Sequence, residues 1–519
     1  MPLLYPESRR SARARGFVWY FVGVNSRAND TLRIAVASKY DMIIVGTGFA
    51  GSFFLMRYLE RASKDVRVLV LERGRIDTKA WQLENRRYSS IREDEVYVNN
   101  NPDSKIWLTS PGFGGNSKCW YAGAMRMMPG DFKLKSRYGV GNDWPMSYED
   151  MEPHYDVVEQ VMLVSGPPDS PMHRSRPFPL PPHRFSTPDE LLKQKFPASW
   201  FNAATARASV ATGQRGVCCA TGFCHLCPVD AKFTIQNGLA HIYDDPRVTL
   251  QLESEVAGVD TGAGVATGVQ YTRKGRTERA DADAIVLAAS ALFNPHIMLR
   301  SGMSHRLLGR GLHEQPSFDV LVDLAGVKAC DGSTVISGNG YMFYEGEHRR
   351  DRAACMIELW SSPFADRPDP LRSERGRWRE RQYFAFLFDD LPREENRVTV
   401  NAASPRLAET TFNGHSDYTQ RAVDRIPEMV AKLGEALPIE RIVSIAEAIS
   451  PGHIQGTVVM GEDPANSIVD GYLVHHQIRN LLVLGASSFP TATPILPTLT
   501  VSALSLRSAD HFLSRGAQS

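Results

Sequence analysis

Two apolar runs separated by a helical pattern follow the first 38 residues of the chain. Residues 41–45 form a run that is apolar from Met42 onwards and ends in glycines, and residues 66–71 form a second strand-like run that ends at Glu72. Between them, residues 52–59 place apolar side chains at helical spacing. Continuous apolar runs of this length are typical of strands buried on both faces of a parallel sheet. The pattern therefore predicts a β-α-β unit of about thirty residues.

Strand patterns return in the second half of the chain. Residues 247–252 and 284–289 carry them, and the second of these is another fully apolar run. Between about residues 317 and 390, apolar and polar residues alternate instead, which predicts half-exposed strands of an antiparallel sheet in a second domain. Prolines between residues 167 and 182 predict extended connections. The fold class predicted is α/β.

Length, composition and charge narrow the class of protein. A chain of 519 residues is too long for one compact core, so we expect two or more folding units. The 59 Lys and Arg residues balance 58 Asp and Glu residues, so we expect no nucleic-acid partner and favour small neutral or weakly charged ones. No apolar run approaches the roughly 20 residues that span a bilayer, and we expect no integral membrane segment.

The first 38 residues are rich in Arg, Ser and Asn and show no period, which predicts a poorly ordered N-terminal extension. Residues 8–10 followed by the apolar residues 16–23 loosely resemble a twin-arginine export signal. The apolar stretch is short and aromatic and lacks a small-residue cleavage site. A cytoplasmic location is therefore favoured, with export alongside a partner subunit as the alternative.

The glycine spacing after the first strand predicts a dinucleotide site. Gly46 permits a tight turn, Gly48 lets the backbone approach a pyrophosphate, and Gly51 lets the helix pack close to the strand. Glu72 follows about 20 residues later, where an acidic side chain accepts hydrogen bonds from a ribose diol. The motif leaves FAD and NAD open, and its place near the start of a long chain favours flavin. The predicted binding residues here are Gly46, Gly48, Phe49, Ala50, Gly51, Glu72 and Arg73.

Three further segments resemble one family. Residues 114–126 are similar to the flavin-contacting loop of the glucose-methanol-choline (GMC) oxidoreductases. Residues 139–155 and the blocks from His453 to Thr500 resemble the branch that contains gluconate, fructose and glucoside dehydrogenases and pyranose oxidases. The resemblance implies a Rossmann-like FAD-binding domain with a discontinuous substrate domain built on an antiparallel sheet. It is thin from about residue 320 to 445.

The resemblance also implies domain boundaries and FAD contacts. The FAD-binding domain would comprise residues 39–135, 225–315 and 450–519, with a connection and lid at 136–224 and a substrate-binding domain at 316–449. Gly115, Asn116 and Ser117 would lie against the isoalloxazine ring, and Val256 would offer its backbone to the adenine. Gly485, Ala486, Pro497 and Thr498 would line the pyrophosphate and the pyrimidine edge.

His453 is the predicted catalytic residue. Oxidation of an alcohol requires removal of the hydroxyl proton as hydride leaves the carbon, and a histidine suits that task. His453 heads a His-x-x-Gly-Thr motif that aligns with the active-site histidine of the family. The family usually places His or Asn where this chain has Leu496, which cannot form a hydrogen bond. Thr493 and Gln455 are the candidates for orienting the substrate in its place.

A run of cysteines leaves two interpretations open. Cys218, Cys224 and Cys227 lie within ten positions of one another. Related dehydrogenases bind an iron–sulfur cluster in a similar run, and thiolates are the usual cluster ligands. The last spacing is one residue shorter than in that pattern, and His225 interrupts it. Reduced structural thiols are therefore favoured over an iron–sulfur cluster.

The sequence thus predicts an FAD-dependent oxidoreductase that oxidises a CH–OH group of a sugar, glycoside or related polyol by hydride transfer to flavin N5. The electron acceptor would be oxygen, a quinone or a redox protein. Leu496 motivates the alternative: a flavoprotein of the same fold whose chemistry is non-oxidative, lyase-like or light-driven, or impaired.

Overall fold

The predicted β-α-β unit begins a parallel sheet. In the computed structural model, which describes residues 39–362 and 376–516, strand β1 (Tyr40–Val45) is followed by helix α1 (Phe49–Arg61) and strand β2 (Val68–Leu71). Strand β1 pairs in parallel with β2 and, along its other edge, with β8 (Arg276–Leu287). The last four side chains of β1 are buried, as a strand covered on both faces requires. The predictions for residues 1–38 lie outside the described residues.

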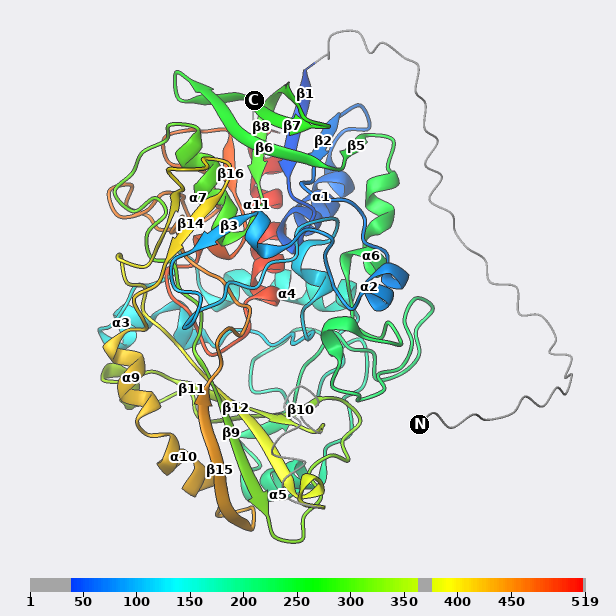
Figure 1. Ribbon diagram of the computed structural model, residues 1–519, viewed down its shortest axis with the longest axis vertical. Helices are drawn as coiled ribbons and strands as arrows, with labels where there is room; N and C mark the ends of the chain where they lie inside the picture. The colour runs from blue at the N-terminus through cyan, green and yellow to red at the C-terminus, as the bar shows by residue number, and fades with distance from the viewer. Residues whose placement is uncertain (1–38, 363–375, 517–519) are drawn as a thin grey trace, which may run out of the picture. The chain divides into compact units, whose positions relative to one another are not determined.

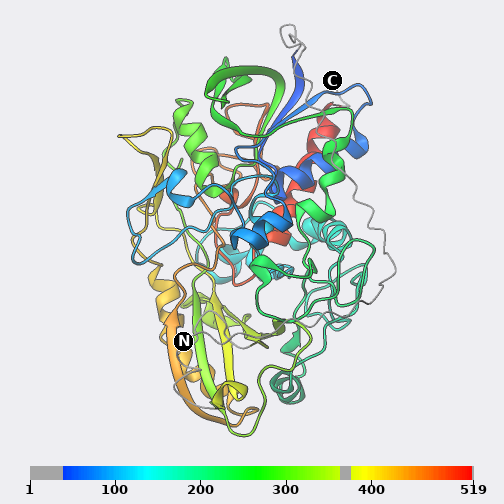
Figure 2. The same cartoon turned by 45° about the vertical axis from the view of Figure 1, so that its right-hand side comes forward.

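Within the described part of the chain, β1 belongs to a seven-stranded sheet of order β5-β2-β1-β8-β7-β6, with β16 paired to β8 (Figure 1). The other strands are β5 (Val248–Gln251), β6 (Ser254–Gly262), β7 (Val265–Arg273) and β16 (Leu481–Val483). Helix α11 (Thr498–Gly516) packs beside α1 (Figure 2). The sheet therefore brings the glycine loop next to segments from the C-terminal part of the chain.

A second, antiparallel sheet has the order β15-β9-β12-β11-β10-β4 among the described residues. Its strands are β4 (Trp200–Asn202), β9 (Ser317–Leu324), β10 (Ile336–Phe343), β11 (Cys355–Trp360), β12 (Arg381–Phe388) and β15 (Ile439–Glu447). The antiparallel sheet is confirmed, but the expectation of half-exposed strands is wrong for β12, in which every residue is buried. Helices α5 (Thr187–Lys195), α9 (Asp417–Val423) and α10 (Ile426–Leu433) supply apolar residues to the core on one face. The other face contributes to the cavity described below.

A third sheet connects distant parts of the sequence. It pairs β13 (Arg397–Val400) with β14 (Ala408–Thr411), and β14 with β3 (Tyr97–Asn99). Strand β4 comes from the predicted connection at 136–224 but joins the six-stranded sheet. Hydrogen-bonded sheets thus cross the predicted domain boundaries, and the division into domains stays a prediction. The other α-helices of the described residues are α2 (Lys79–Asn85), α3 (Leu134–Tyr138), α4 (Tyr148–Met162), α6 (Ile235–Gly238) and α7 (Ser290–Arg300).

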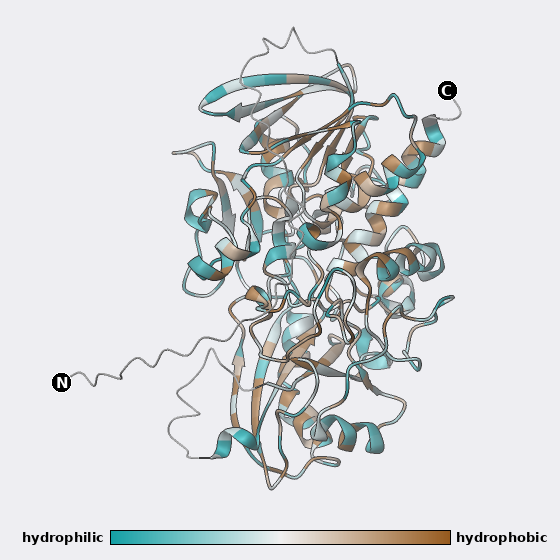
Figure 3. Cartoon of the chain, turned by 90° about the vertical axis from the view of Figure 1, so that its right-hand side faces the viewer, coloured by the Kyte–Doolittle hydropathy of each residue, from teal (hydrophilic) through white to brown (hydrophobic). Residues whose placement is uncertain are grey.

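Apolar residues concentrate in the sheets, and several surface helices show alternating polar and apolar faces (Figure 3). This distribution is the one expected when helices bury one stripe against a sheet. Among the described residues, no helix combines the length and apolar character needed to cross a lipid bilayer.

Candidate functional site

The loop from Gly46 to Gly51 has the geometry of a phosphate-binding turn. Gly46 has a φ of +103°, and a Cβ there would lie 2.5 Å from the carbonyl oxygen of Ala288. A Cβ at Gly51 would lie 2.2 Å from the carbonyl oxygen of Gly46, whereas a Cβ at Gly48 would meet no protein atom within 4 Å. Gly48 is the N-cap of α1 and supplies no side-chain cap to the first amides of the helix. Those amides and the open space above Gly48 fit a pyrophosphate.

Glu72, the predicted ribose acceptor, already holds three segments of the chain together. Its carboxylate accepts hydrogen bonds from the backbone N–H and the hydroxyl of Thr47, at 3.1 and 2.7 Å. It also accepts from the backbone N–H groups of Gly74 and Gly112, each at 3.1 Å. Four donors occupy about the full acceptor capacity of a carboxylate. The contacts assign Glu72 a positioning role, and its contact with a ribose stays a prediction.

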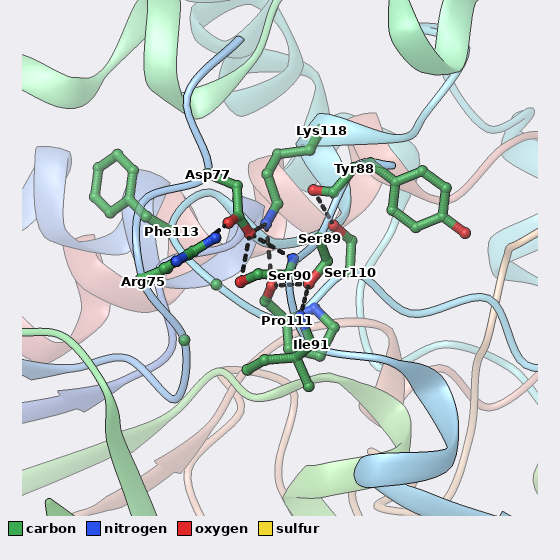
Figure 4. Close-up of polar contacts among 12 residues, drawn as sticks. Arg75, Asp77, Tyr88, Ser89, Ser90, Ile91, Ser110, Pro111, Phe113 and Lys118 are labelled. Atoms are coloured by element: carbon green, nitrogen blue, oxygen red, sulfur yellow. Dashed lines mark hydrogen bonds and ion pairs between the residues drawn. The ribbon is translucent and has the colours of Figure 1, made fainter. Parts of the chain in front are cut away.

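A buried lysine holds in place the loop that lies next to the glycine loop (Figure 4). The Nζ atom of Lys118 donates to the carbonyl oxygen of Pro111 at 3.0 Å and lies 3.6 Å from the carboxylate of Asp77. Asp77 also accepts hydrogen bonds from Arg75 and Ser90, at 3.0 and 2.9 Å. Burial lowers the pKa of Lys118, and the charge of Asp77 opposes that shift.

This anchoring places Gly115 directly over the glycine loop. A Cβ at Gly115 would lie 3.1 Å from the Cα atom of Gly48. The amide of Asn116 accepts from the backbone of Ser110 at 2.9 Å and donates to Leu108 at 3.2 Å. The two loops that were predicted to contact the pyrophosphate and the isoalloxazine ring are therefore adjacent.

A cavity of about 650 Å³ runs along these loops, within the 300–1,000 Å³ typical of ligand sites. The predicted residues that line it are Gly46, Gly48, Phe49, Ala50, Glu72, Arg73, Gly115, Asn116, Val256, His453, Gly485, Ala486, Leu496, Pro497 and Thr498. The sheet thus brings dinucleotide-loop residues and the predicted catalytic histidine, far apart in sequence, to the walls of one cavity.

Four of the residues predicted to bind FAD or to orient the substrate do not line that cavity. Gly51 packs against the loop itself, as its close approach to Gly46 shows. The hydroxyl of Ser117 donates to Gly114 at 2.6 Å, and that of Thr493 donates to the carbonyl oxygen of Ile495 at 3.2 Å. Gln455 is buried. The geometry gives no support to the predicted roles of Ser117 at the flavin or of Thr493 and Gln455 at the substrate, and those roles stay predictions.

A buried ion pair fixes the backbone of His453. Its backbone N–H donates to the carboxylate of Glu314 at 3.0 Å, and Glu314 forms an ion pair with Lys105. Burial lowers the pKa of His453 to about 4, with a smaller contribution from the charge of Lys105. The ring nitrogen Nδ1 has no hydrogen-bond partner among the described residues. The ring is therefore neutral near pH 7.

The six-stranded sheet supplies cavity residues that sequence reasoning missed. Asp319, Glu358, Trp360 and Tyr383 all line the cavity. The hydroxyl of Tyr383 donates to Asp319 at 2.7 Å, and the indole of Trp360 donates to Glu358 at 3.3 Å. Burial raises the pKa of Glu358 to about 7. Alternation along each strand was a signal for these positions, but it does not say which face meets a cavity.

The cysteine run contributes a histidine rather than a thiol to the cavity. His225 lines it and shares a hydrogen bond of 3.2 Å with the hydroxyl of Tyr121. Cys218, Cys224 and Cys227 do not line it. Over residues 39–362 and 376–516, no group of three or more His, Cys, Asp or Glu side chains is placed to hold a metal ion. The structure thus gives no support to the iron–sulfur cluster considered from the sequence.

Comparisons with known proteins agree with this geometry. Two models described as GMC oxidoreductase match residues 40–317 and 392–505. The large subunit of fructose dehydrogenase from Gluconobacter japonicus is 25% identical, over 91% of this chain and 98% of that protein. The gluconate 2-dehydrogenase flavoprotein of Pantoea cypripedii is 24% identical, over 91% and 93%. The crystal structure of pyridoxine 4-oxidase from Mesorbium loti superposes with a TM-score of 0.66 at 17% identity, over 91% of this chain and 99% of that one, which shows a shared fold.

Proposed function

Because the chain belongs to the GMC oxidoreductases, a family of FAD-dependent enzymes, we propose that it oxidises a CH–OH group of a sugar, glycoside or related polyol. The observation that carries the proposal is that the glycine loop and His453 line one cavity. Relatives named for fructose and gluconate oxidation support the substrate class.

The start of α1 would hold the pyrophosphate of FAD, because its first amides receive no side-chain cap and a Cβ at Gly48 would meet no protein atom within 4 Å. The backbone of Val256 would face the adenine, and Gly115 and Asn116 would face the flavin ring. Pro497 and Thr498 begin helix α11 at the cavity, and a helix N-terminus favours negative charge there. Bound FAD would supply the hydride acceptor.

His453 would take the hydroxyl proton while the substrate carbon gives up its hydride, so that CH–OH becomes C=O. Its ring is neutral near pH 7 and can therefore accept a proton. Glu314 fixes the backbone at His453, and the buried ion pair with Lys105 keeps Glu314 in place. Leu496 offers the substrate oxygen only an apolar contact.

Leu496 is also the observation behind a second candidate function, namely non-oxidative, lyase-like, light-driven or impaired chemistry on the same fold.

We propose oxygen, a quinone or a redox protein as electron acceptor. We propose a cytoplasmic location, with export alongside a partner subunit as the alternative; both rest on the composition of residues 1–38.

The proposal is tested by anaerobic mixing of the FAD-loaded enzyme with a panel of sugars, glycosides and polyols. We expect at least one of them to bleach the oxidised flavin absorbance and to yield the matching carbonyl compound. If dithionite bleaches the flavin and no alcohol does, the proposal is wrong. A product formed without flavin reduction would instead favour the second candidate function.

A further inference from the structure

The wall that the six-stranded sheet gives to the cavity carries two carboxylates on one face. Ala385 of β12 lies opposite Glu358 of β11 and opposite Asp319 of β9. Residues directly opposite each other in a sheet point to the same face, and adjacent strands lie about 4.8 Å apart. All three residues line the cavity. Glu358 and Asp319 therefore present their acidic groups to the same space, with the small side chain of Ala385 between them.

The described residues use only part of the hydrogen-bonding capacity of the Glu358 carboxylate. The residue is 3% exposed. Its Oε2 atom accepts from the indole of Trp360 at 3.3 Å, and its Oε1 atom has no hydrogen-bond partner among the described residues. Asn339 lies opposite Glu358 on β10, and within the described part of the chain neither polar atom of its amide has a hydrogen-bond partner. A buried carboxylate oxygen without a partner is costly, so a ligand group that donates hydrogen bonds there would be stabilising.

The described residues offer little positive charge to balance the carboxylate of Glu358. The neighbouring donors Trp360 and Tyr383 are neutral. Among the described residues, this sheet brings no lysine or arginine to the cavity wall; its contribution is Ser317, Asp319, Ile336, Glu358, Trp360, Tyr383, Ala385 and Leu387. The cation that acts on Glu358 is Arg207. Its guanidinium donates hydrogen bonds to backbone carbonyl oxygens and to the hydroxyl of Thr334.

We propose that Glu358 binds an ammonium group of the substrate, so that the enzyme prefers an amine-bearing sugar or polyol over the hydroxyl-bearing counterpart. This inference rests on the proposed oxidation of a CH–OH group in the same cavity. An ammonium group has three donors and a positive charge, whereas a hydroxyl has one donor and none. Glu358 selects the substrate and takes no part in the transfer of the proton or the hydride.

Turnover tests the preference directly. The FAD-loaded enzyme is mixed at pH 7 with glucose and with its 2-, 3- and 6-amino-deoxy derivatives, and flavin reduction is followed at rising concentrations. We expect at least one amino derivative to have a KM about ten- to a hundredfold below that of glucose, the range of a charge-assisted hydrogen bond. The isosteric variant Glu358→Gln should remove that difference, because the amide carries no charge to attract the ammonium group.

A matched control isolates the buried carboxylate. Glu347→Gln makes the same chemical change at a side chain that is 82% exposed and does not line the cavity. This variant should keep the preference for the amino derivative. Equal KM values for glucose and all amino derivatives in the unmodified enzyme would overturn the inference while leaving the proposed function intact. A preference that survives in Glu358→Gln would overturn it as well.

Binding of cyclohexylammonium separates the inference from the proposed function, because this cation has no hydroxyl to oxidise. Its dissociation constant is measured from the change in flavin absorbance of the oxidised enzyme. We expect Glu358→Gln to weaken binding about tenfold or more relative to the unmodified protein and to Glu347→Gln. Equal binding in all three proteins overturns the inference, whether or not any sugar reduces the flavin.

Discussion

The same substitution should have opposite effects at two glycines of the loop that begins α1. In Gly51→Ala the new methyl group would lie 2.2 Å from the carbonyl oxygen of Gly46, a backbone atom that cannot turn aside. In Gly48→Ala the methyl group would meet no protein atom within 4 Å, and the backbone of Gly48, with a φ of −71°, suits alanine. The first variant therefore tests the packing of the protein, and the second tests the space reserved for the cofactor.

The two substitutions should change different quantities. Gly51→Ala should lower the free energy of unfolding, whereas Gly48→Ala should lower the affinity for FAD. Overpacking of this type lowers the free energy of unfolding by about 1–3 kcal/mol, so Gly51→Ala should unfold at lower urea concentration. Gly48→Ala should leave the FAD-free protein as stable as before or more stable by up to about 1 kcal/mol. Its methyl group occupies the space that we assign to the pyrophosphate, so FAD affinity should fall by about tenfold or more, which is at least about 1.4 kcal/mol.

Two assays on the FAD-free proteins separate these effects. Urea unfolding followed by tryptophan fluorescence measures the stability of the fold, and titration with FAD followed by quenching of flavin fluorescence measures affinity. Unchanged FAD affinity in Gly48→Ala would refute the path assigned to the pyrophosphate. Unchanged urea unfolding in Gly51→Ala would refute the close contact between Gly51 and Gly46.

Three further predictions concern single side chains. Because burial lowers the pKa of His453 from 6.5 to about 4 and the ring must be neutral to accept a proton, kcat/KM should fall on the acid side near pH 4, not near pH 6.5; a limb near 6.5 would contradict this. Burial opposes protonation of His415, but its hydrogen bond to Asp390 and its ion pair with Glu447 raise its pKa to about 9. The stability from this contact is complete below pH 6.5 and is lost as pH rises through 9, so the unfolding midpoint should fall over that range in the unmodified protein and less in His415→Gln. Leu496→Asn should raise the rate of flavin reduction about two- to tenfold, the effect of one hydrogen bond; an unchanged or lower rate in stopped-flow would show that Leu496 does not limit the reaction.

The sequence predicted those features whose signals are local. The first strand, the glycine loop and the first helix follow from apolar runs and from the spacing of Gly46, Gly48 and Gly51, and the structure places them as expected. Glu72 follows the second strand at the expected position, yet its contacts to Thr47, Gly74 and Gly112 could not be read from spacing. The contact with Gly112, for example, depends on a segment that lies 40 residues further along the chain.

The cavity wall formed by the six-stranded sheet could not be predicted from the sequence, for a physical reason. Alternation in a strand identifies two faces, but it does not say which face packs on helices and which borders a cavity. In β12, both faces are covered, so burial gives no contrast that a pattern could show. That Glu358 and Asp319 lie on the same face of the sheet therefore follows only from the pairing of three strands. Similarly, a motif identified the segment around Thr493 but not that its hydroxyl turns to the carbonyl oxygen of Ile495.

The central claim is that a C–H bond of a CH–OH group breaks in this cavity with the help of His453. The most direct measurement is the anaerobic rate of flavin reduction by the best substrate, with hydrogen or deuterium on the carbon that carries the hydroxyl, in the unmodified protein and in His453→Ala. We expect deuterium to slow reduction, and His453→Ala to retain FAD but to be reduced at least about a hundredfold more slowly, the lower range for loss of a general base. Reduction that is equally fast with deuterium, or equally fast in His453→Ala, would contradict the claim.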